Sequence, residues 1–147
     1  MGAMENPRVL SIEAANALVP RLRDLMQGQM DRRHAIEQQL GRLAAHLGRA
    51  PDNLVPSEDD PAVVRELKSD ISDRVQRYEA AWAELEEMGA VLKDPRSGLV
   101  DFCGRVDGKL VWLCWRFGED AVTHYHDLDE GFAGRKPLEP VLRRHLN

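Results

Sequence analysis

The chain has 147 residues, of which 31% are charged, and its formal net charge at pH 7 is -5. This length predicts a single domain spanning 1–147 with one hydrophobic core. The negative net charge, with no basic stretch of the kind that contacts phosphates, excludes a nucleic-acid partner from our prediction. No apolar run approaches the roughly 20 residues that a membrane span needs, so we predict no membrane association.

The compartment is predicted from the start of the chain and from its cysteines. No charged and then apolar leader precedes the first helix pattern, which favours a cytoplasmic location. Cys103 and Cys114 are the only two cysteines, too few for a disulfide scaffold. A reducing compartment would keep both as thiols.

Two apolar stripes predict two long helices, over 11–47 and 61–93. Ser11 is a good N-cap for the first helix. The segment 48–61 contains several prolines and an acidic cluster, so it is a loop that closes one helix and opens the next. Together the two helices predict a long antiparallel helical hairpin that resembles a coiled coil.

A two-helix hairpin this long leaves apolar surface uncovered, which predicts a homodimer formed through the helices. One part of the first stripe is polar, because Gln27-Gly28-Gln29 and Arg32-Arg33-His34 interrupt it. This interruption is either a solvated helix face or a polar contact zone.

From 98 to 127 the apolar period becomes two, which predicts a small antiparallel sheet of two or three strands. Asp107-Gly108 is a strong signal for a two-residue hairpin turn, and it pairs Asp101 with Cys114 and Cys103 with Trp112. Because side chains alternate along each strand, one face of the sheet is apolar and the other has the polar and reactive side chains. The apolar face has Val100, Phe102, Val111, Leu113 and Trp115, and the other face has Asp101, Cys103, Arg105, Trp112, Cys114 and Arg116.

The third strand has two possible registers. If 117–120 form the turn, Cys114 pairs with Thr123, and His124 and His126 point to the face opposite Cys114. A turn that is one residue longer returns both histidines to the side of Cys114. The sequence leaves the two registers open. A loop-rich tail follows over 128–147, and the predicted fold class is α+β.

Several motifs occur together along the chain: E-A-A-N-A-L-V-P at 13–20, G-L-V-D-F at 98–102, L-C-W-R-x-G-E at 113–119, a histidine at 126, and G-F-A-G-R at 131–135. In this combination the chain resembles an uncharacterised bacterial family, domain of unknown function 2203, over nearly all of its length after residue 9. The resemblance implies no activity. It implies that the functional residues are Asp101, Cys114, Arg116, Glu119, His126 and Arg135. The family pattern more often has proline where this chain has Cys103, which argues against a mechanism that needs both cysteines.

The most concrete functional hypothesis is a metal site in the C-terminal third. Thiolate and imidazole ligands suit zinc, so we predict that Cys114, Glu119 and His126 bind zinc or another transition metal. Their spacing matches none of the usual zinc patterns. The alternative is that Cys114 is a small buried hydrophobe and that the histidines bond to neighbouring carboxylates.

Three other hypotheses remain. Arg105, Arg116 and Arg135 offer forked donors to a small anion, and the alternative is that Arg116 simply pairs with Asp101. The predicted ligand-binding residues are Asp101, Arg116, Glu119, His126 and Arg135. Glu119 and His126 could form an acid-base pair, or Cys114 could be a nucleophile, but no known reaction motif is present and enzyme activity stays open. A scaffold protein could bind a protein partner through its helical hairpin. We predict a cytoplasmic binding protein, with metal ligation as its first candidate function.

Overall fold

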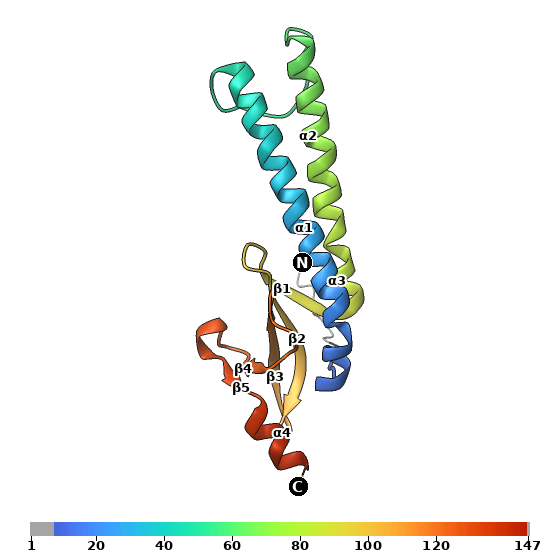
Figure 1. Ribbon diagram of the computed structural model, residues 1–147, viewed down its shortest axis with the longest axis vertical. Helices are drawn as coiled ribbons and strands as arrows, with labels where there is room; N and C mark the ends of the chain where they lie inside the picture. Colours follow the sequence, from blue (N-terminus) through green and yellow to red (C-terminus); the bar gives the residue numbers. More distant parts are fainter. Residues whose placement is uncertain (1–7, 147) are drawn as a thin grey trace. The chain divides into compact units, whose positions relative to one another are not determined.

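The computed structural model of the protein describes residues 8–146 (Figure 1). The fold class is α+β, as predicted. The elements in chain order are α1 (Ile12–Leu47), α2 (Ala62–Ala81), α3 (Ala83–Met88), β1 (Ala90–Asp94), β2 (Leu99–Val106), β3 (Lys109–Arg116), β4 (His124–His126), the 3-10 helix η1 (Phe132–Gly134), β5 (Lys136–Pro137) and α4 (Glu139–Leu146). No helix within 8–146 is both long and apolar enough to cross a membrane.

The chain divides into two compact units, and α1 contributes to both. The sheet unit contains the chain up to Met26 and again from Glu84 onward, and the helical unit is Gln27–Ala83. The single-domain organisation stays a prediction.

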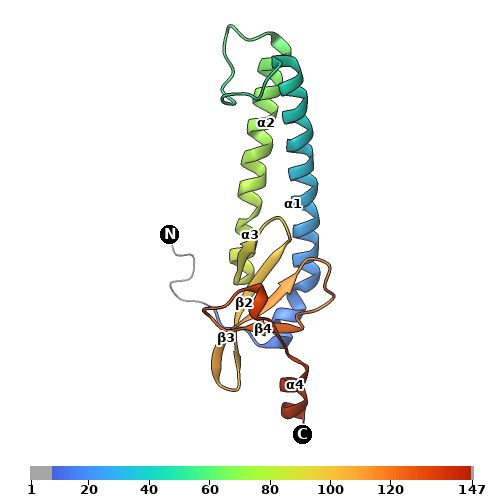
Figure 2. The ribbon, with the colours of Figure 1, turned by 90° about the vertical axis from the view of Figure 1, so that its left-hand side faces the viewer.

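In the helical unit, the second part of α1 packs along α2 (Figure 2). Gln29 Nε2 donates to the backbone carbonyl of Tyr78 at 2.8 Å, and Gln39 Nε2 donates to Asp70 at 2.8 Å. Because the higher-numbered residue of α1 contacts the lower-numbered residue of α2, the two segments run antiparallel. Their buried core consists of Leu43, Val64, Leu67 and Ile71.

The predicted helix over 61–93 is interrupted at Trp82 and extends too far at its C-terminal end, so the structure differs from the predicted helical hairpin. The helix α2 ends at Ala81, and the short α3 ends at Met88. Gly89 then adopts a φ of 75°, which glycine tolerates and which terminates a helix. The residues from Ala90 onward are extended and pair with β2.

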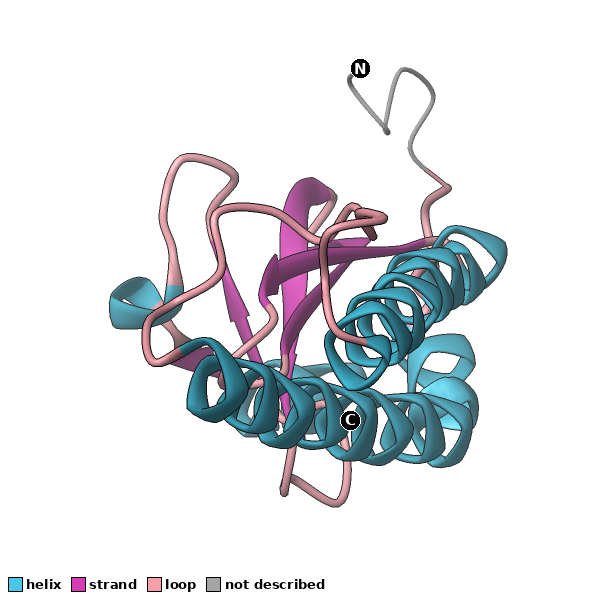
Figure 3. Cartoon of the chain, turned by 90° about the horizontal axis from the view of Figure 1, so that it is seen from above, coloured by secondary structure: helices cyan, strands magenta, loops and turns pink. Residues whose placement is uncertain are grey.

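The sheet has five strands in the order β1-β2-β3-β4-β5, and the predicted two or three strands are therefore too few. All neighbouring strands are antiparallel, and they form one sheet (Figure 3). The additional strands lie at the two edges. The strand β1 comes from the segment predicted as helix, and β5 comes from the predicted loop-rich tail, which also contains η1 and α4.

The central hairpin has the predicted register. Asp107 and Gly108 have φ values of 52° and 80°, as a type I′ turn requires at its two central residues. Asp101 lies opposite Cys114, and Cys103 lies opposite Trp112. The hairpin prediction is confirmed.

The strand β4 adopts the register with the longer turn. Cys114 lies opposite His124, and Trp112 lies opposite His126. Glu119 helps to close this turn, because its backbone N–H donates to the Arg116 carbonyl at 2.9 Å and its own carbonyl accepts from Trp115 Nε1 at 2.9 Å. Both histidines therefore share the sheet face of Cys114.

The apolar face of the sheet is buried as predicted. Its members Val100, Phe102, Val111, Leu113 and Trp115 are each 0–1% exposed. The first turns of α1 supply further buried residues of this unit, among them Ala15, Val19 and Leu22. Asn16 of α1 accepts a hydrogen bond from the backbone N–H of Val122 at 2.7 Å, which ties the start of the helix to the strand connection.

Candidate metal centre

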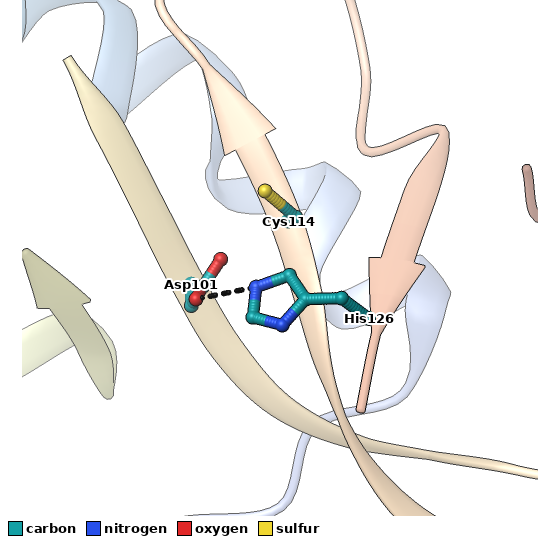
Figure 4. A group of neighbouring side chains, drawn as sticks. All are labelled: Asp101, Cys114 and His126. Carbon is teal, nitrogen blue, oxygen red and sulfur yellow. Dashed lines mark hydrogen bonds and ion pairs between the residues drawn. The ribbon is translucent and has the colours of Figure 1, made fainter. Parts of the chain in front are cut away.

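Three adjacent strands bring a carboxylate, a thiol and an imidazole together. Asp101 lies on β2, Cys114 lies opposite it on β3, and His126 lies on β4 two residues beyond the partner of Cys114. Strand alternation places all three side chains on one face, where they gather (Figure 4). Their ligand atoms lie within 4.8 Å of one another. The exposed fractions of the residues are 0%, 0% and 1%, so the group is shielded from water.

The hydrogen bonds of His126 determine its tautomer. Its Nδ1 lies 2.9 Å from the backbone carbonyl of Asp127, and its Nε2 lies 2.8 Å from Asp101 Oδ2. A carbonyl oxygen only accepts, so Nδ1 carries a proton and donates it. The contact between Nε2 and Oδ2 then needs one further proton, which either partner can carry. The Asp101–His126 pair is neutral overall in both cases.

Asp101 is only partly satisfied by this pair. Burial raises the pKa of its carboxyl group, while the charge of His126, hydrogen bonding by Cys114 and His126, and the charge of Lys93 oppose the increase. Its second oxygen, Oδ1, is buried and has no hydrogen-bond partner. Leaving a buried acceptor without a partner costs about 1–3 kcal/mol. A cation beside Oδ1 would offset that cost.

Cys114 is protonated at neutral pH in this environment. Burial is the main cause and the negative charge of Asp101 is the second, and they raise the pKa of the Cys114 thiol to about 12. A thiol is a poor nucleophile compared with a thiolate, which argues against the hypothesis that Cys114 attacks a substrate. A coordinated metal ion reverses this situation, because a thiol that binds a metal is deprotonated.

The three donors suit one class of ion. Carboxylate oxygen, thiolate sulfur and imidazole nitrogen are the ligands of zinc and of related transition metals. Ligating histidines commonly donate their other ring N–H to a backbone carbonyl, as His126 Nδ1 does to Asp127. The buried Asp101, Cys114 and His126 group could therefore hold a metal ion.

Comparison with known proteins identifies the family. The model of a family described as "Uncharacterized conserved protein (DUF2203)" matches residues 8–138. The chain belongs to this family. The match contains the whole candidate metal centre and confirms the resemblance found in the sequence motifs, while the bacterial origin stays a prediction. No curated protein and no solved structure matches the chain.

Glu119, predicted as a metal ligand, lies outside the buried group of this DUF2203 chain. It sits between β3 and β4, where Oε1 and Oε2 accept from Arg135 Nη2 at 2.8 and 2.9 Å. Its Oε1 also accepts from the backbone N–H of Arg116 at 2.7 Å. Asp101, predicted only as a ligand-binding residue, takes the third place beside Cys114 and His126. The predicted register already placed Asp101 opposite Cys114, so it could have indicated Asp101 as a third ligand.

The predicted arginines form a second cluster next to the buried group. The ring of Phe132 lies 4.8 Å from the Arg135 guanidinium and 5.4 Å from that of Arg116. Arg135 Nη2 approaches the Cys114 carbonyl at 3.4 Å, and Arg135 Nε is buried without a hydrogen-bond partner. Arg116 is exposed and lines a surface hollow together with Asp94, Ser97, Leu99 and Phe132.

Lys93 was not predicted from the sequence as a site residue. Its ammonium group lies 4.2 Å from the ring centre of Trp112, and its charge acts on Asp101. Lys93 belongs to β1, which was predicted as helix, so strand alternation was not applied to it. Cys103 shares the sheet face of the group but is not a member, and His124 bonds through Nδ1 to Thr123 Oγ1 at 2.9 Å.

Proposed function

We propose that the protein binds a transition metal ion, with zinc as the first candidate, through Asp101 carboxylate, Cys114 thiolate and His126 Nε2. One observation carries this proposal. Three chemically different donors from three strands converge within 4.8 Å in a buried position, and one carboxylate oxygen there lacks a partner. An apolar core has no need for such a combination, because buried polar groups are costly unless they are paired.

The charge balance of the group also supports the proposal. Without metal, the Asp101–His126 pair is neutral and Cys114 is a neutral thiol. A divalent ion would displace the proton between Asp101 and His126 and the proton of Cys114. The ion, one carboxylate, one thiolate and a neutral imidazole would again have no net charge. The exchange therefore avoids a buried net charge, which would be costly.

The number of ligands suggests how the ion would be held. Three protein ligands leave a fourth tetrahedral position for water or a small ligand, as in catalytic zinc sites, whereas structural sites use four protein ligands. The burial of Asp101, Cys114 and His126 favours retention of the ion over access by a bulky substrate. We therefore propose a metal-binding protein and assign no reaction.

The proposal includes a reducing, cytoplasmic location, in which Cys114 remains available as a ligand. Both cysteines are free and buried in the structure. A homodimer through the helices and a scaffold role for the helical unit stay predictions.

A second candidate function is the binding of a small anion by Arg116 and Arg135. The observation that favours it is Arg135 Nε, a buried donor without a hydrogen-bond partner. Arg135 contacts the Phe132 ring, as does Arg116, and Arg116 and Phe132 both line the surface hollow. The substitution Arg116→Gln would reduce an anion-induced increase in melting temperature and leave the metal content unchanged. Loss of metal in this variant would contradict a separate anion site.

The test of the main proposal is the metal content of tag-free protein, purified without chelator and measured by elemental mass spectrometry. We expect about one transition metal ion per chain in the wild type, and loss of the ion in Cys114→Ala and His126→Ala. Cys103→Ala is the matched control, because Cys103 is the other buried cysteine on the same sheet face.

Circular dichroism of each variant would confirm that the protein measured is folded. A wild type that stays free of metal after incubation with zinc would contradict the proposal. Retention of the ion by a folded Cys114→Ala variant would contradict it as well.

A further inference from the structure

Three arginines of the helical unit line one cavity. Arg32 comes from α1, and Arg74 and Arg77 come from α2. Arg32 belongs to the polar interruption of the first apolar stripe, which the sequence left open between a solvated face and a contact zone. All three residues lie within Gln27–Ala83, so the cavity belongs to a single compact unit.

Arg32 is held in place by a buried amide. Its Nη1 donates to Gln29 Oε1 at 2.8 Å, and Gln29, only 2% exposed, donates in turn to the Tyr78 carbonyl. A Cβ added at Gly28 would lie 3.0 Å from Arg32 Nη1, so glycine leaves room for the guanidinium against the helix. The Arg32 guanidinium is therefore positioned before any ligand arrives.

Arg74 is also held, but most of its donors remain available. Its Nε donates to Asp70 Oδ2 at 2.8 Å, and the same oxygen accepts from Gln39. These two hydrogen bonds, with that of Arg74 the stronger, lower the pKa of Asp70, so it stays a carboxylate. Both terminal nitrogens of Arg74 are left without a hydrogen bond among the described residues.

Arg77 adds a third charge to the cavity. It makes no hydrogen bond with the residues that the structure describes, and its charge acts on Asp70. Three arginines thus line one cavity, and one of them is bonded to Asp70, in a chain whose net charge is -5. Like charges repel when they are held close together, so this convergence is unfavourable unless an anion offsets it.

We infer that the cavity lined by Arg32, Arg74 and Arg77 binds a phosphate group, either as free phosphate or as part of a small phosphate monoester. Guanidinium groups match tetrahedral oxyanions through paired, charge-assisted N–H···O bonds. The excess positive charge favours a phosphate, which approaches two negative charges at neutral pH, over a singly charged carboxylate. The inference uses no residue of the metal centre and does not depend on it.

The test is a calorimetric titration of the full chain with inorganic phosphate and with glycerol phosphate, at constant ionic strength maintained with chloride. We expect Arg77→Gln to weaken binding about tenfold, the loss of one charge-assisted contact. Arg77 is exposed, so this variant should fold normally. Arg42→Gln is the matched control, because it removes the same charge from an exposed position of α1 outside this cavity.

A second variant, Arg77→Lys, separates geometry from charge, because lysine keeps the charge without the fork. We expect its affinity to fall between those of the wild type and Arg77→Gln. Equal affinity for the two ligands would assign the site to free phosphate, and tighter binding of glycerol phosphate would assign it to a monoester. Absence of phosphate binding to the wild type, or equal weakening in Arg77→Gln and Arg42→Gln, would overturn the inference.

Discussion

The two units each bury a polar side chain, and they treat it differently. Gln29 in the helical unit donates to the Tyr78 carbonyl and accepts from Arg32, so both ends of its amide are used. Asp101 in the sheet unit is 0% exposed, and only one of its oxygens is hydrogen-bonded. Gln29 can be explained as part of the packing between two helices. Asp101 lacks a comparable structural explanation.

The difference shows where a function is best sought. Folded proteins satisfy nearly all buried polar atoms, so an exception indicates strain, an ion or a ligand. Among the described residues two buried side-chain atoms are exceptions, and one of them, Asp101 Oδ1, lies beside a thiol and an imidazole, which are metal ligands. In the helical unit, the buried Gln29 instead holds Arg32, which lines a surface cavity.

The largest expected effect concerns Asp101 itself. Asp101→Ala removes one partner of the buried Asp101–His126 pair, so the free energy of unfolding of the metal-free protein should fall by about 3–5 kcal/mol. Urea unfolding in the presence of chelator measures this change. Asp129→Ala, at an exposed position, should change it by less than about 0.5 kcal/mol. If Asp101→Ala lowered the free energy of unfolding as little as Asp129→Ala does, the Asp101–His126 pair would not stabilise the sheet.

Gln29→Ala tests the other side of the comparison. It leaves the Tyr78 carbonyl and Arg32 without their partner, and we expect a loss of about 1–3 kcal/mol. Gln38→Ala, on an exposed part of the same helix, is the control. Thermal unfolding would compare the two, and metal content should be unchanged in both. Loss of metal in Gln29→Ala would contradict the separation of the two units.

Alkaline pH should destabilise the metal-free protein through Cys114. Its pKa is raised from 9.0 to about 12 by burial and by Asp101, so the unfolded chain loses the thiol proton first as the pH rises. The stabilisation is complete below the unfolded pKa and is lost between these two values, with a slope of at most about 1.4 kcal/mol per pH unit. Cys114→Ala should lack this component. If the free energy of unfolding changed with pH in the same way in the wild type and in Cys114→Ala, the alkaline loss of stability would not come from Cys114.

Glu119→Gln should have the smallest effect. The substitution weakens the ion pair with Arg135, in which the Glu119 side chain is partly exposed. We expect the free energy of unfolding to fall by about 1 kcal/mol. The metal content should stay at the wild-type level, because Glu119 lies outside the buried group. Elemental analysis of this variant would decide between the site predicted from sequence and the site in the structure.

Local signals in the sequence predicted a large part of the fold. Ser11 and the apolar spacing predicted the first helix, and Ser11 Oγ does accept from the backbone N–H of Ala14 at 3.0 Å. The turn residues Asp107 and Gly108 predicted the register of the central hairpin. The strand β1 was missed because Val91 and Leu92 continue the helical period, while the positive φ of Gly89 is a property of the folded backbone.

The residues of the site were easier to predict than their grouping. Asp101, Cys114 and His126 were all singled out, but the position of His126 depends on a turn length that local sequence does not determine. Glu119 was included because it is near the histidines in the chain. Its partner Arg135 comes from a segment that only the folded structure places beside it.

X-ray absorption spectroscopy at the zinc edge, on protein incubated with one equivalent of zinc, would detect coordination by Cys114 directly. We expect one sulfur ligand at about 2.3 Å with nitrogen and oxygen ligands at about 2.0–2.2 Å, and loss of the sulfur ligand in Cys114→Ala but not in Cys103→Ala. A spectrum with nitrogen and oxygen ligands only in the wild type would place the zinc on the surface and contradict the proposed centre.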